Sequence, residues 1–284
     1  MPPSPQMLSL ANDLQLAYRD WGQGQPVLLL HGLADHGLVW QSLAESLSDR
    51  YRCIAPDLRG HGESSKPPET DYDSRMLAAD LEALAQHLTL EQVDVVAHSW
   101  AAKIALLWAR QQPQRIRRLV LVDPFFVNRL PGLFRPTLPL LYRTLPFLKV
   151  MGPFPSYEAA VAVARTLKQY RGWSALQEAV FKAGMERKLE GGWGSKFAIA
   201  ARNGVFQDTL QLAGLTEAIA TPTCVLLPKQ GLNRTDFQLK PYRQYLTQLT
   251  MTPIPGNHWP HLVEPEALNQ AVATFLETPF GSQN

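Results

Sequence analysis

The sequence is poor in cysteine, with two in 284 residues, and it has no long hydrophobic run. Two thiols cannot supply the disulfide framework of a small secreted domain. Cys53 and Cys224 both stand in short apolar runs, so we predict two buried, reduced thiols. No apolar stretch reaches the roughly 18 residues that span a bilayer. Residues 1–5 lack a basic segment followed by an apolar run, so we expect no secretory leader and a cytoplasmic location.

Charged residues are also few, at 18% of the chain, whereas apolar residues make up 45%. This balance is typical of a folded globular protein and not of a disordered one. The chain has no metal-ligand spacing and no phosphate-binding glycine loop, so we expect no cofactor. Its basic residues are not interleaved with a base-reading motif, so no nucleic-acid partner is expected.

The net charge of +2 conceals a basic middle segment. Between Lys103 and Lys196 there are sixteen Lys and Arg against five Asp and Glu, whereas the rest of the chain has eleven against twenty. Such a segment can face an anionic partner, for example lipid headgroups or an acidic substrate. It can equally be a solvated surface without a partner, and the composition favours neither interpretation.

Short apolar runs alternate with helical patterns, which predicts a doubly wound α/β fold with a mostly parallel sheet. The predicted strands cover residues 27–30, 53–55, 93–96, 119–122 and 224–227. The predicted helices cover residues 38–47, 76–88, 101–112 and 266–276, the last one starting directly after Pro265. The length is large for one domain but suits an α/β core that carries an insertion.

The alternation stops after Asp123, and residues 125–212 contain no convincing buried strand. Six prolines divide the first part of this segment, and helical patterns follow at residues 157–170 and 173–185. We therefore predict a helical cap at residues 125–212, inserted over the carboxyl edge of a core formed by residues 1–124 and 213–284.

A serine stands at the apex of a strand, a tight turn and a helix start, in the sequence VVAHSWAA at residues 95–102. A turn this sharp projects the hydroxyl of Ser99 from the edge of the sheet, as a nucleophile requires. The usual pattern has glycine two residues before and two after the serine. Here Ala97 and Ala101 take those places, which small alanine side chains permit sterically.

A histidine-containing loop, PGNHWPH at residues 255–261, precedes the last predicted helix. The base of a serine triad follows the nucleophile in chain order and comes from such a loop in this type of fold. We predict His258 as this base, because a glycine-led loop can deliver its side chain to the sheet edge. His261 is the competitor, but it falls at the approach to a helix. We assign His31 no catalytic role.

These motifs, with DLRGHGES at residues 57–64, the His31-Gly32 turn and the later Glu264-Pro265 pair, resemble the α/β-hydrolase superfamily. The resemblance is greatest to its capped branch of small esterases, proline iminopeptidases and haloalkane dehalogenases. It implies an α/β-hydrolase fold with a helical cap inserted after the sixth strand. A dehalogenase or an epoxide hydrolase would need aspartate in place of Ser99. An iminopeptidase usually has HGGPG, which the HGLAD of residues 31–35 does not match.

The resemblance also implies an oxyanion hole and a triad acid. The backbone N–H groups of Leu33 and Trp100 would bind the oxyanion. Members of the superfamily usually place the acid just beyond the strand that is here residues 224–227, but residues 228–233 have no carboxylate. Some relatives place it after the preceding strand, where Asp123 stands. We predict Asp123, with Asp236 as the second candidate and the lack of a functional acid as the third possibility.

We therefore predict a serine hydrolase that cleaves a small hydrophobic ester through an acyl-enzyme. The apolar start of the cap, interrupted by Arg135, Arg143 and Lys149, could line an acyl pocket, lie peripherally on a membrane or simply pack on the core. Two other classes of function stay open. One is a carbon–carbon hydrolase or cofactor-free lyase on the same triad, and the other is a ligand receptor of low activity.

Overall fold

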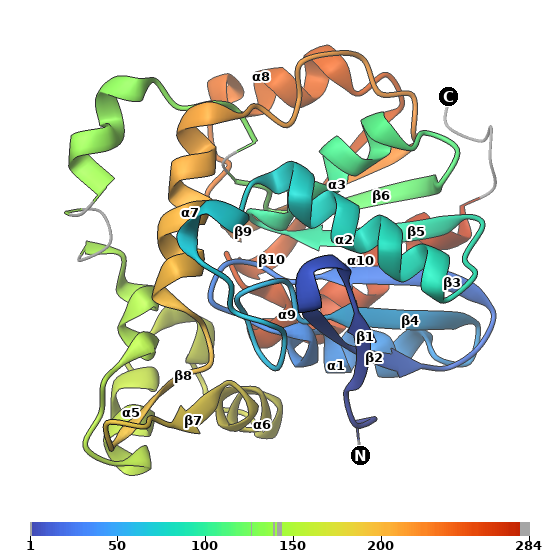
Figure 1. Ribbon diagram of the computed structural model, residues 1–284. Coiled ribbons are helices and arrows are strands. Elements are labelled where there is room, and N and C mark those ends of the chain that lie inside the picture. The colour runs from blue at the N-terminus through green and yellow to red at the C-terminus, as the bar shows by residue number, and fades with distance from the viewer. Residues whose placement is uncertain (1, 126, 139, 141–143, 279–284) are drawn as a thin grey trace.

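The computed structural model describes residues 2–125, 127–138, 140 and 144–278. These residues form an eight-stranded sheet with the order β1-β2-β4-β3-β5-β6-β9-β10 (Figure 1). Its strands are β1 (Gln6–Ser9), β2 (Gln15–Trp21), β3 (Gln25–Leu30), β4 (Tyr51–Pro56), β5 (Val93–His98), β6 (Ile116–Val122), β9 (Thr223–Gln230) and β10 (Leu249–Asn257). The pairs β1–β2 and β2–β4 are antiparallel, and all other neighbours are parallel.

Helices cover both faces of this sheet, as the nearly continuous apolar character of the central strands requires. On one face α2 (Ser74–His87) packs against α3 (Ala101–Gln111), and on the other α1 (Gln41–Leu47) packs against α10 (Pro265–Glu277) (Figure 1). All six residues of β5 are buried between these layers. The predicted α/β-hydrolase fold, with a mostly parallel doubly wound sheet, is thus confirmed. Cys53 and Cys224 are buried, free thiols.

Three strands at the edges of the sheet lie outside the predicted apolar runs. Strands β1 and β2 form an antiparallel extension at the amino-terminal end. Strand β10 is the opposite edge, and it contains Pro253 and Pro255, which lack the N–H that an inner strand must donate. Most of its residues are only half-buried, so it lacks the continuous apolar run of an inner strand.

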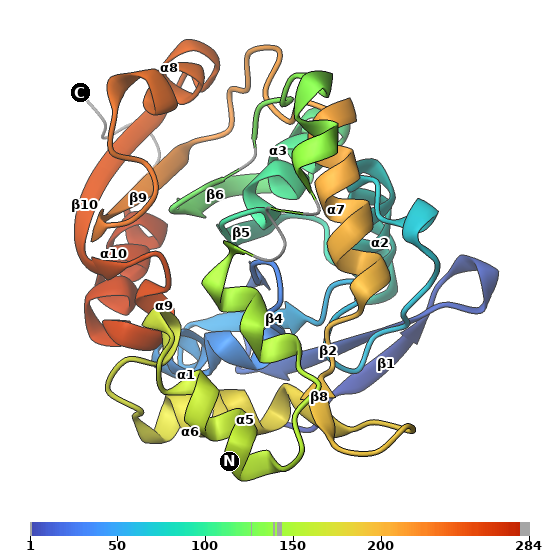
Figure 2. The ribbon, with the colours of Figure 1, turned by 90° about the vertical axis from the view of Figure 1, so that its left-hand side faces the viewer.

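The segment between β6 and β9 lies at the edge of the sheet that faces the viewer in Figure 2. It contains the α-helices α5 (Tyr157–Ala164), α6 (Ala175–Ala183) and α7 (Ile199–Gln211) and the shorter 3-10 helices η4 (Gly132–Thr137), η5 (Pro146–Met151) and η6 (Lys168–Tyr170). This segment follows the sixth strand, as predicted. Its division from the core at residues 125 and 212 stays a prediction.

Two details of the insertion differ from the prediction. Residues 185–187 and 193–195 form a small antiparallel sheet, β7 (Met185–Arg187) and β8 (Trp193–Ser195), where no strand was expected. Each strand has three residues, too few for a recognisable apolar run, and Gly191 and Gly192 make the turn at positive φ. The helix expected over 157–170 ends at Ala164, because the chain becomes extended at Leu167 before η6.

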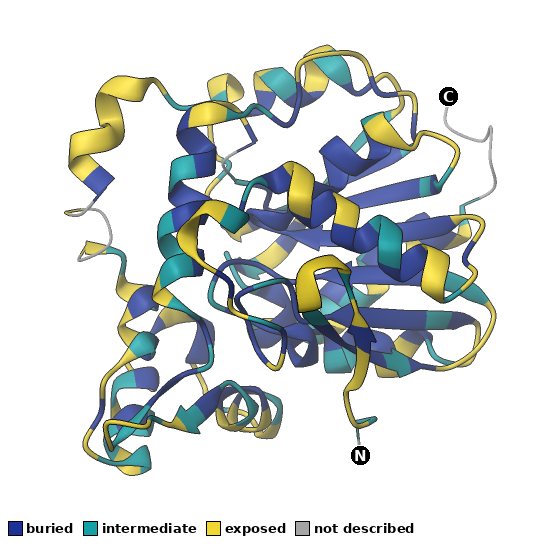
Figure 3. Cartoon of the chain, in the orientation of Figure 1, coloured by how far each residue is buried: buried dark blue, intermediate teal, exposed yellow. Residues whose placement is uncertain are grey.

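The start of the insertion exposes several apolar side chains. Residues 131–137, which include η4, are all exposed and stand away from the sheet (Figure 3). The side chains of Leu133 and Leu140 are 74% and 65% exposed. Arg143, predicted as one of the basic residues of this region, lies outside the described residues. Among the described residues, no helix is both long and apolar enough to span a bilayer.

Candidate active site

Ser99 occupies the sharp turn that the sequence predicts. It follows β5 directly, has a φ of 55°, and precedes the first residue of α3 by two positions. A positive φ is strained for a residue with a Cβ, and such strain is typical of a nucleophile at a strand-to-helix turn. Ala97 and Ala101 are fully buried on either side, so the close approach of strand and helix tolerates alanine at both places.

His258 lies between Ser99 and Asp123. Its Nε2 atom is 2.8 Å from Ser99 Oγ, and its Nδ1 atom is 2.6 Å from Asp123 Oδ2. The serine comes from the turn after β5, the aspartate from the end of β6 and the histidine from the loop after β10. The structure therefore brings together three residues that are up to 159 positions apart in the chain. The arrangement is that of a nucleophile, a base and an acid that orients the base.

The Asp123 carboxylate receives further hydrogen bonds from the loop after β9. Leu232 N donates to its Oδ2 atom at 2.8 Å, and the side-chain Nδ2 of Asn233 donates to its Oδ1 atom at 2.9 Å. Burial raises the pKa of Asp123, but His258, Asn233 and the Leu232 N–H together lower it below 3.8. The carboxylate is thus ionised at neutral pH. It can only accept from Nδ1, which leaves Nε2 free to take a proton from Ser99.

In the superfamily that the sequence resembles, a loop at the position of residues 228–233 usually holds the triad acid, but the structure shows a different role for this loop. It contributes no acid but donates hydrogen bonds to the acid of the preceding strand. A Cβ atom on Gly231 would lie 2.6 Å from Asp123 Oδ2, so this close approach requires glycine. Asp236, the second candidate acid, lies at the start of α8 (Asp236–Tyr245) with its side chain 91% exposed and paired with Arg243. The structure does not bring Asp236 to His258.

The two predicted oxyanion-hole residues both line the cavity that contains Ser99. Among the hydrogen bonds of the described residues, none uses the backbone N–H of Leu33 or of Trp100. Two free N–H groups beside a nucleophile are what a developing oxyanion needs. Gly32 also has to be small, because a Cβ atom there would lie 2.6 Å from His98 Nδ1 and 3.4 Å from Ser99 Cβ.

Among the described residues, no other buried histidine has a hydrogen bond to the Ser99 side chain. His31 accepts a hydrogen bond from Leu58 N at its Nε2 atom, a structural role that agrees with the absence of any catalytic assignment. His261 is buried in α9 (Pro260–Val263), where burial lowers its pKa to about 3. It lies beside His98 and Asp35, and these three form the one group among the described residues that could hold a metal ion.

A cavity of about 560 Å³ opens over Ser99 and His258. Its walls are largely apolar and combine residues from the strand ends with residues of the insertion, among them Leu145, Phe147, Leu167 and Phe206. This size and lining suit a small organic molecule with a hydrophobic part. Residues of the insertion thus form part of the cavity wall beside Ser99.

Sequence reasoning missed two residues that shape the site. Asn233 bonds to Asp123, and Asn257 fixes the histidine loop by accepting from Trp259 N and donating to the Lys168 carbonyl of the insertion. Asn233 is six residues beyond a predicted strand end, and Asn257 is next to the predicted base. These positions were the signal in the sequence that either residue could belong to the site. Their partners are distant in the chain, so the sequence alone could not reveal the bonds.

Comparison with known proteins gives the family. A sequence profile described as the alpha/beta hydrolase fold matches residues 25–265. The soluble epoxide hydrolase of Corynebacterium sp. is 33% identical over 127 residues, 45% of this chain and 42% of that protein. The cis-3-alkyl-4-alkyloxetan-2-one decarboxylase of Xanthomonas campestris is 35% identical over 130 residues, 42% of this chain and 43% of that protein. The chain thus matches less than half the length of these curated relatives.

Solved structures agree over nearly the whole chain. E-2-(acetamidomethylene)succinate hydrolase aligns with a TM-score of 0.79 at 21% identity, covering 97% of this chain and 99% of that one. A thermophilic esterase from Thermogutta terrifontis aligns with a TM-score of 0.73 at 22% identity, covering 96% of this chain and 98% of that one. At these identities the likeness shows the fold alone, whereas the profile spans most of the sequence. The chain belongs to the alpha/beta hydrolase family.

Proposed function

We propose that this chain is a serine hydrolase that cleaves a hydrophobic carboxylic ester through an acyl-enzyme. The observation that carries the proposal is the continuous line from Ser99 Oγ through His258 to the Asp123 carboxylate, with contacts of 2.8 and 2.6 Å. A serine hydroxyl is a weak nucleophile by itself and becomes effective when a base within hydrogen-bond reach removes its proton.

In the proposed mechanism, His258 Nε2 takes the proton of Ser99 as the oxygen attacks the ester carbonyl. The oxyanion of the tetrahedral intermediate accepts hydrogen bonds from the N–H groups of Leu33 and Trp100. Collapse breaks the bond to the alkoxide, which leaves as an alcohol with the proton from Nε2. Water then attacks the acyl-Ser99 ester, again giving its proton to His258, and the carboxylic acid departs with the serine restored. Asp123 stays ionised and stabilises the imidazolium in both steps.

Ser99 also separates this proposal from the activities named for some relatives. The epoxide hydrolase chemistry of the superfamily uses an aspartate nucleophile, and this chain has a serine at that place. The apolar cavity supports an ester with a hydrophobic acyl or alcohol part. Its size of about 560 Å³ favours a substrate larger than an acetate ester.

The test is hydrolysis of p-nitrophenyl esters from acetate to palmitate, together with labelling by a fluorophosphonate. We expect turnover with an optimum beyond acetate, and one label per chain on Ser99. Ser99→Ala should abolish labelling and lower kcat by about 10⁴-fold or more. Ser46→Ala, at an exposed serine of α1, is the matched control and should keep wild-type labelling and wild-type kcat. A wild-type chain that neither labels nor turns over any ester would contradict the proposal and favour a ligand receptor.

A lyase reaction is the second candidate, because one relative is named for decarboxylation of an alkylated oxetan-2-one, which is a cyclic ester. An acyl-enzyme on Ser99 would open such a ring to a hydroxy acid, whereas a decarboxylase would release carbon dioxide and an alkene. Product analysis with a dialkyl oxetan-2-one distinguishes the two outcomes. If wild type and Ser99→Ala form the alkene at equal rates, the reaction is a decarboxylation that does not use an acyl-enzyme.

We further propose that the exposed start of the insertion rests on an anionic lipid surface. Leu133, Phe134 and Leu140 are exposed apolar residues, and the exposed Arg129 and Arg135 flank the first two. Apolar side chains beside cations are suited to the interface of a bilayer with acidic headgroups. Sedimentation with phosphatidylserine vesicles should be lost in Leu133→Asp and kept in Leu189→Asp, an exposed leucine of the β7–β8 turn. Equal sedimentation of both variants would contradict this proposal.

A further inference from the structure

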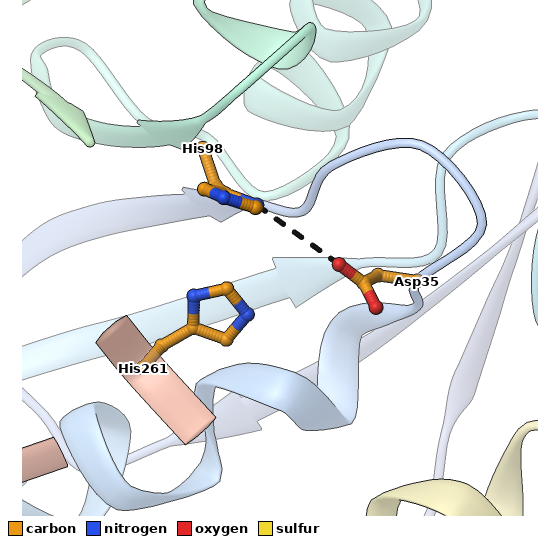
Figure 4. Close-up of side chains that lie close together, drawn as sticks. All are labelled: Asp35, His98 and His261. Atoms are coloured by element: carbon orange, nitrogen blue, oxygen red, sulfur yellow. Dashed lines mark ion pairs between the residues drawn. The ribbon is translucent and has the colours of Figure 1, made fainter. Parts of the chain in front are cut away.

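We propose that Asp35, His98 and His261 form a buried binding site for a Zn²⁺ ion beside the candidate active site. The three residues come from the loop after β3, the end of β5 and helix α9. Their candidate ligand atoms all lie within 4.8 Å of one another, and His98 Nδ1 is 3.9 Å from Asp35 Oδ2 (Figure 4). The proposal does not depend on ester hydrolysis, because among the described residues no hydrogen bond joins these three side chains to Ser99, although His98 directly precedes it in the chain.

Four polar atoms of this cluster have no hydrogen-bond partners among the described residues. Asp35 Oδ2, His98 Nδ1 and both ring nitrogens of His261 are buried and unpaired. The three residues are only 7%, 1% and 2% exposed, so bulk water does not reach them. Buried polar atoms are normally bonded, and four unpaired atoms at one place indicate that something else satisfies them. A cation would bind three of these atoms, one from each side chain.

The hydrogen bond of His98 fixes which of its nitrogens can bind a metal. Its Nε2 atom lies 2.6 Å from the backbone carbonyl of His258. A carbonyl only accepts, so Nε2 carries the proton and Nδ1, 3.9 Å from Asp35 Oδ2, keeps its lone pair (Figure 4). Histidine ligands of metals commonly donate their second N–H to a carbonyl or carboxylate, which orients the ring. His98 already has this outer contact.

The donor set favours zinc among the common ions. Two imidazoles and one carboxylate match the nitrogen and oxygen ligands of Zn²⁺, whereas Mg²⁺ and Ca²⁺ prefer oxygen alone. Tetrahedral bonds of about 2.0–2.1 Å place ligand atoms about 3.4 Å apart. The side chains would therefore close by a little over 1 Å around the ion. Asp35 also borders a cavity of about 20 Å³, room for one water, which could serve as the fourth ligand.

The site would act on the neighbouring triad through His98, whose ring also lies 4.7 Å from that of His258. Ligation fixes the ring of His98, and that ring holds the carbonyl of His258, the proposed base. Zinc would thus stiffen the loop after β10 and increase the thermal stability of the whole chain. Asp35 and His98 are positioning residues in this scheme, since neither touches the atoms that react.

The test measures metal directly and does not rely on turnover. The full chain is refolded with and without Zn²⁺, desalted, and assayed for zinc by mass spectrometry, with Co²⁺ as a spectroscopic substitute. We expect about one Zn²⁺ per wild-type chain, a higher Tm with zinc, and the intense visible absorption of tetrahedral Co²⁺. Asp35→Asn and His261→Phe, which keep the shape of their side chains, should each reduce bound zinc at least tenfold.

The control is His87→Gln, because His87 is an exposed histidine outside the cluster and should leave zinc content unchanged. Circular dichroism establishes that each variant is folded before its metal is counted. Wild-type chain that binds no zinc under either condition would overturn the proposal, and so would variants that retain the wild-type stoichiometry. Labelling of Ser99 by fluorophosphonate is measured on the same samples, so failure of the zinc site and failure of the proposed hydrolase are told apart.

Discussion

Two groups of carboxylate and histidine lie next to each other in this chain and differ in how completely they are bonded. Asp123 and His258 use their polar atoms in hydrogen bonds to each other, to Ser99 and to the loop after β9. Asp35, His98 and His261 are as deeply buried, yet four of their polar atoms have no partner among the described residues. The two groups meet at His98, whose Nε2 atom bonds to the carbonyl of residue 258 and whose ring lies 4.7 Å from that of His258.

The comparison shows that hydrogen-bond donors, more than burial, determine whether a carboxylate is ionised. Burial tends to raise the pKa of both acids, but the N–H groups around Asp123 reverse that effect and keep its pKa below 3.8. No such donor to Asp35 is found among the described residues, and burial raises its pKa to about 8. The bonded group is suited to hold one histidine in one tautomer, which is the requirement for a general base.

The largest expected effect comes from removing the charge of the bonded group. In Asp123→Asn the amide can donate to Nδ1, so the wrong tautomer of His258 is favoured and Nε2 no longer accepts from Ser99. We expect kcat on p-nitrophenyl butyrate to fall by about 10³–10⁴-fold. Asp236→Asn, at the exposed carboxylate paired with Arg243, should stay close to wild type. Equal losses in the two variants would show that Asp123 is not the acid.

The second prediction disturbs both groups at their shared boundary. A Cβ atom in Gly32→Ala would lie 2.6 Å from His98 Nδ1 and 3.4 Å from Ser99 Cβ. The ring of His98, the residue before Ser99, must shift, and a displacement of about 1 Å at a reacting group can cost about 10²-fold in rate. We expect kcat to fall by about 10–100-fold together with a lower Tm. The control Gly132→Ala has no atom within 4 Å of the added Cβ, so a loss there as large as in Gly32→Ala would refute the steric explanation.

The third prediction weakens the donors around Asp123 without removing its charge. Asn233→Ala deletes the 2.9 Å bond to Oδ1, while the Leu232 N–H remains. A hydrogen bond to a charged group contributes about 1.5–3 kcal/mol, so a roughly 10-fold loss of kcat is expected if about half of that reaches the transition state. Steady-state kinetics measures kcat. The control is Asn203→Ala, because the Asn203 side chain bonds to Glu69. Unchanged kcat in Asn233→Ala would mean that the loop serves only stability.

The smallest effect concerns a buried histidine outside both groups. Burial, with a smaller contribution from His31, holds the pKa of His61 well below 6.5. Below pH 6.5 the unfolded chain binds a proton that the folded chain does not, so stability present above that pH is lost as the pH falls. The loss is about 1.4 kcal/mol per pH unit for one such group.

The free energy of unfolding, measured with urea between pH 7.5 and 5, should therefore depend less steeply on pH in His61→Phe than in wild type. The difference in slope should be about that amount. Phenylalanine keeps the stacking with Phe197, whose ring centroid is 4.5 Å away. His87→Gln, at an exposed histidine, should show the wild-type slope. A His61→Phe slope equal to that of wild type would indicate that His61 is protonated in the folded chain.

The sequence predicted the parts of the fold whose physical signal is local. The inner strands β3, β5 and β6 contain nearly continuous apolar runs because both of their faces are covered, and that pattern is readable along the chain. The edge strand β10, interrupted by two prolines, and the three-residue strands β7 and β8 have no such pattern. Their formation depends on a neighbouring segment that supplies the missing bonds.

The same division applies to the site. The serine turn and the histidine loop have local signatures, and by themselves they determined Ser99 and His258 as candidates. Which carboxylate meets His258 was open among Asp123, Asp236 and neither, and only the tertiary structure decided it. It also decided that the loop at 228–233 donates to Asp123 and that Asp35, His98 and His261 converge. These contacts join residues that are far apart in the chain. The distances between them depend on how strands and helices pack, and a local pattern of residues does not contain that information.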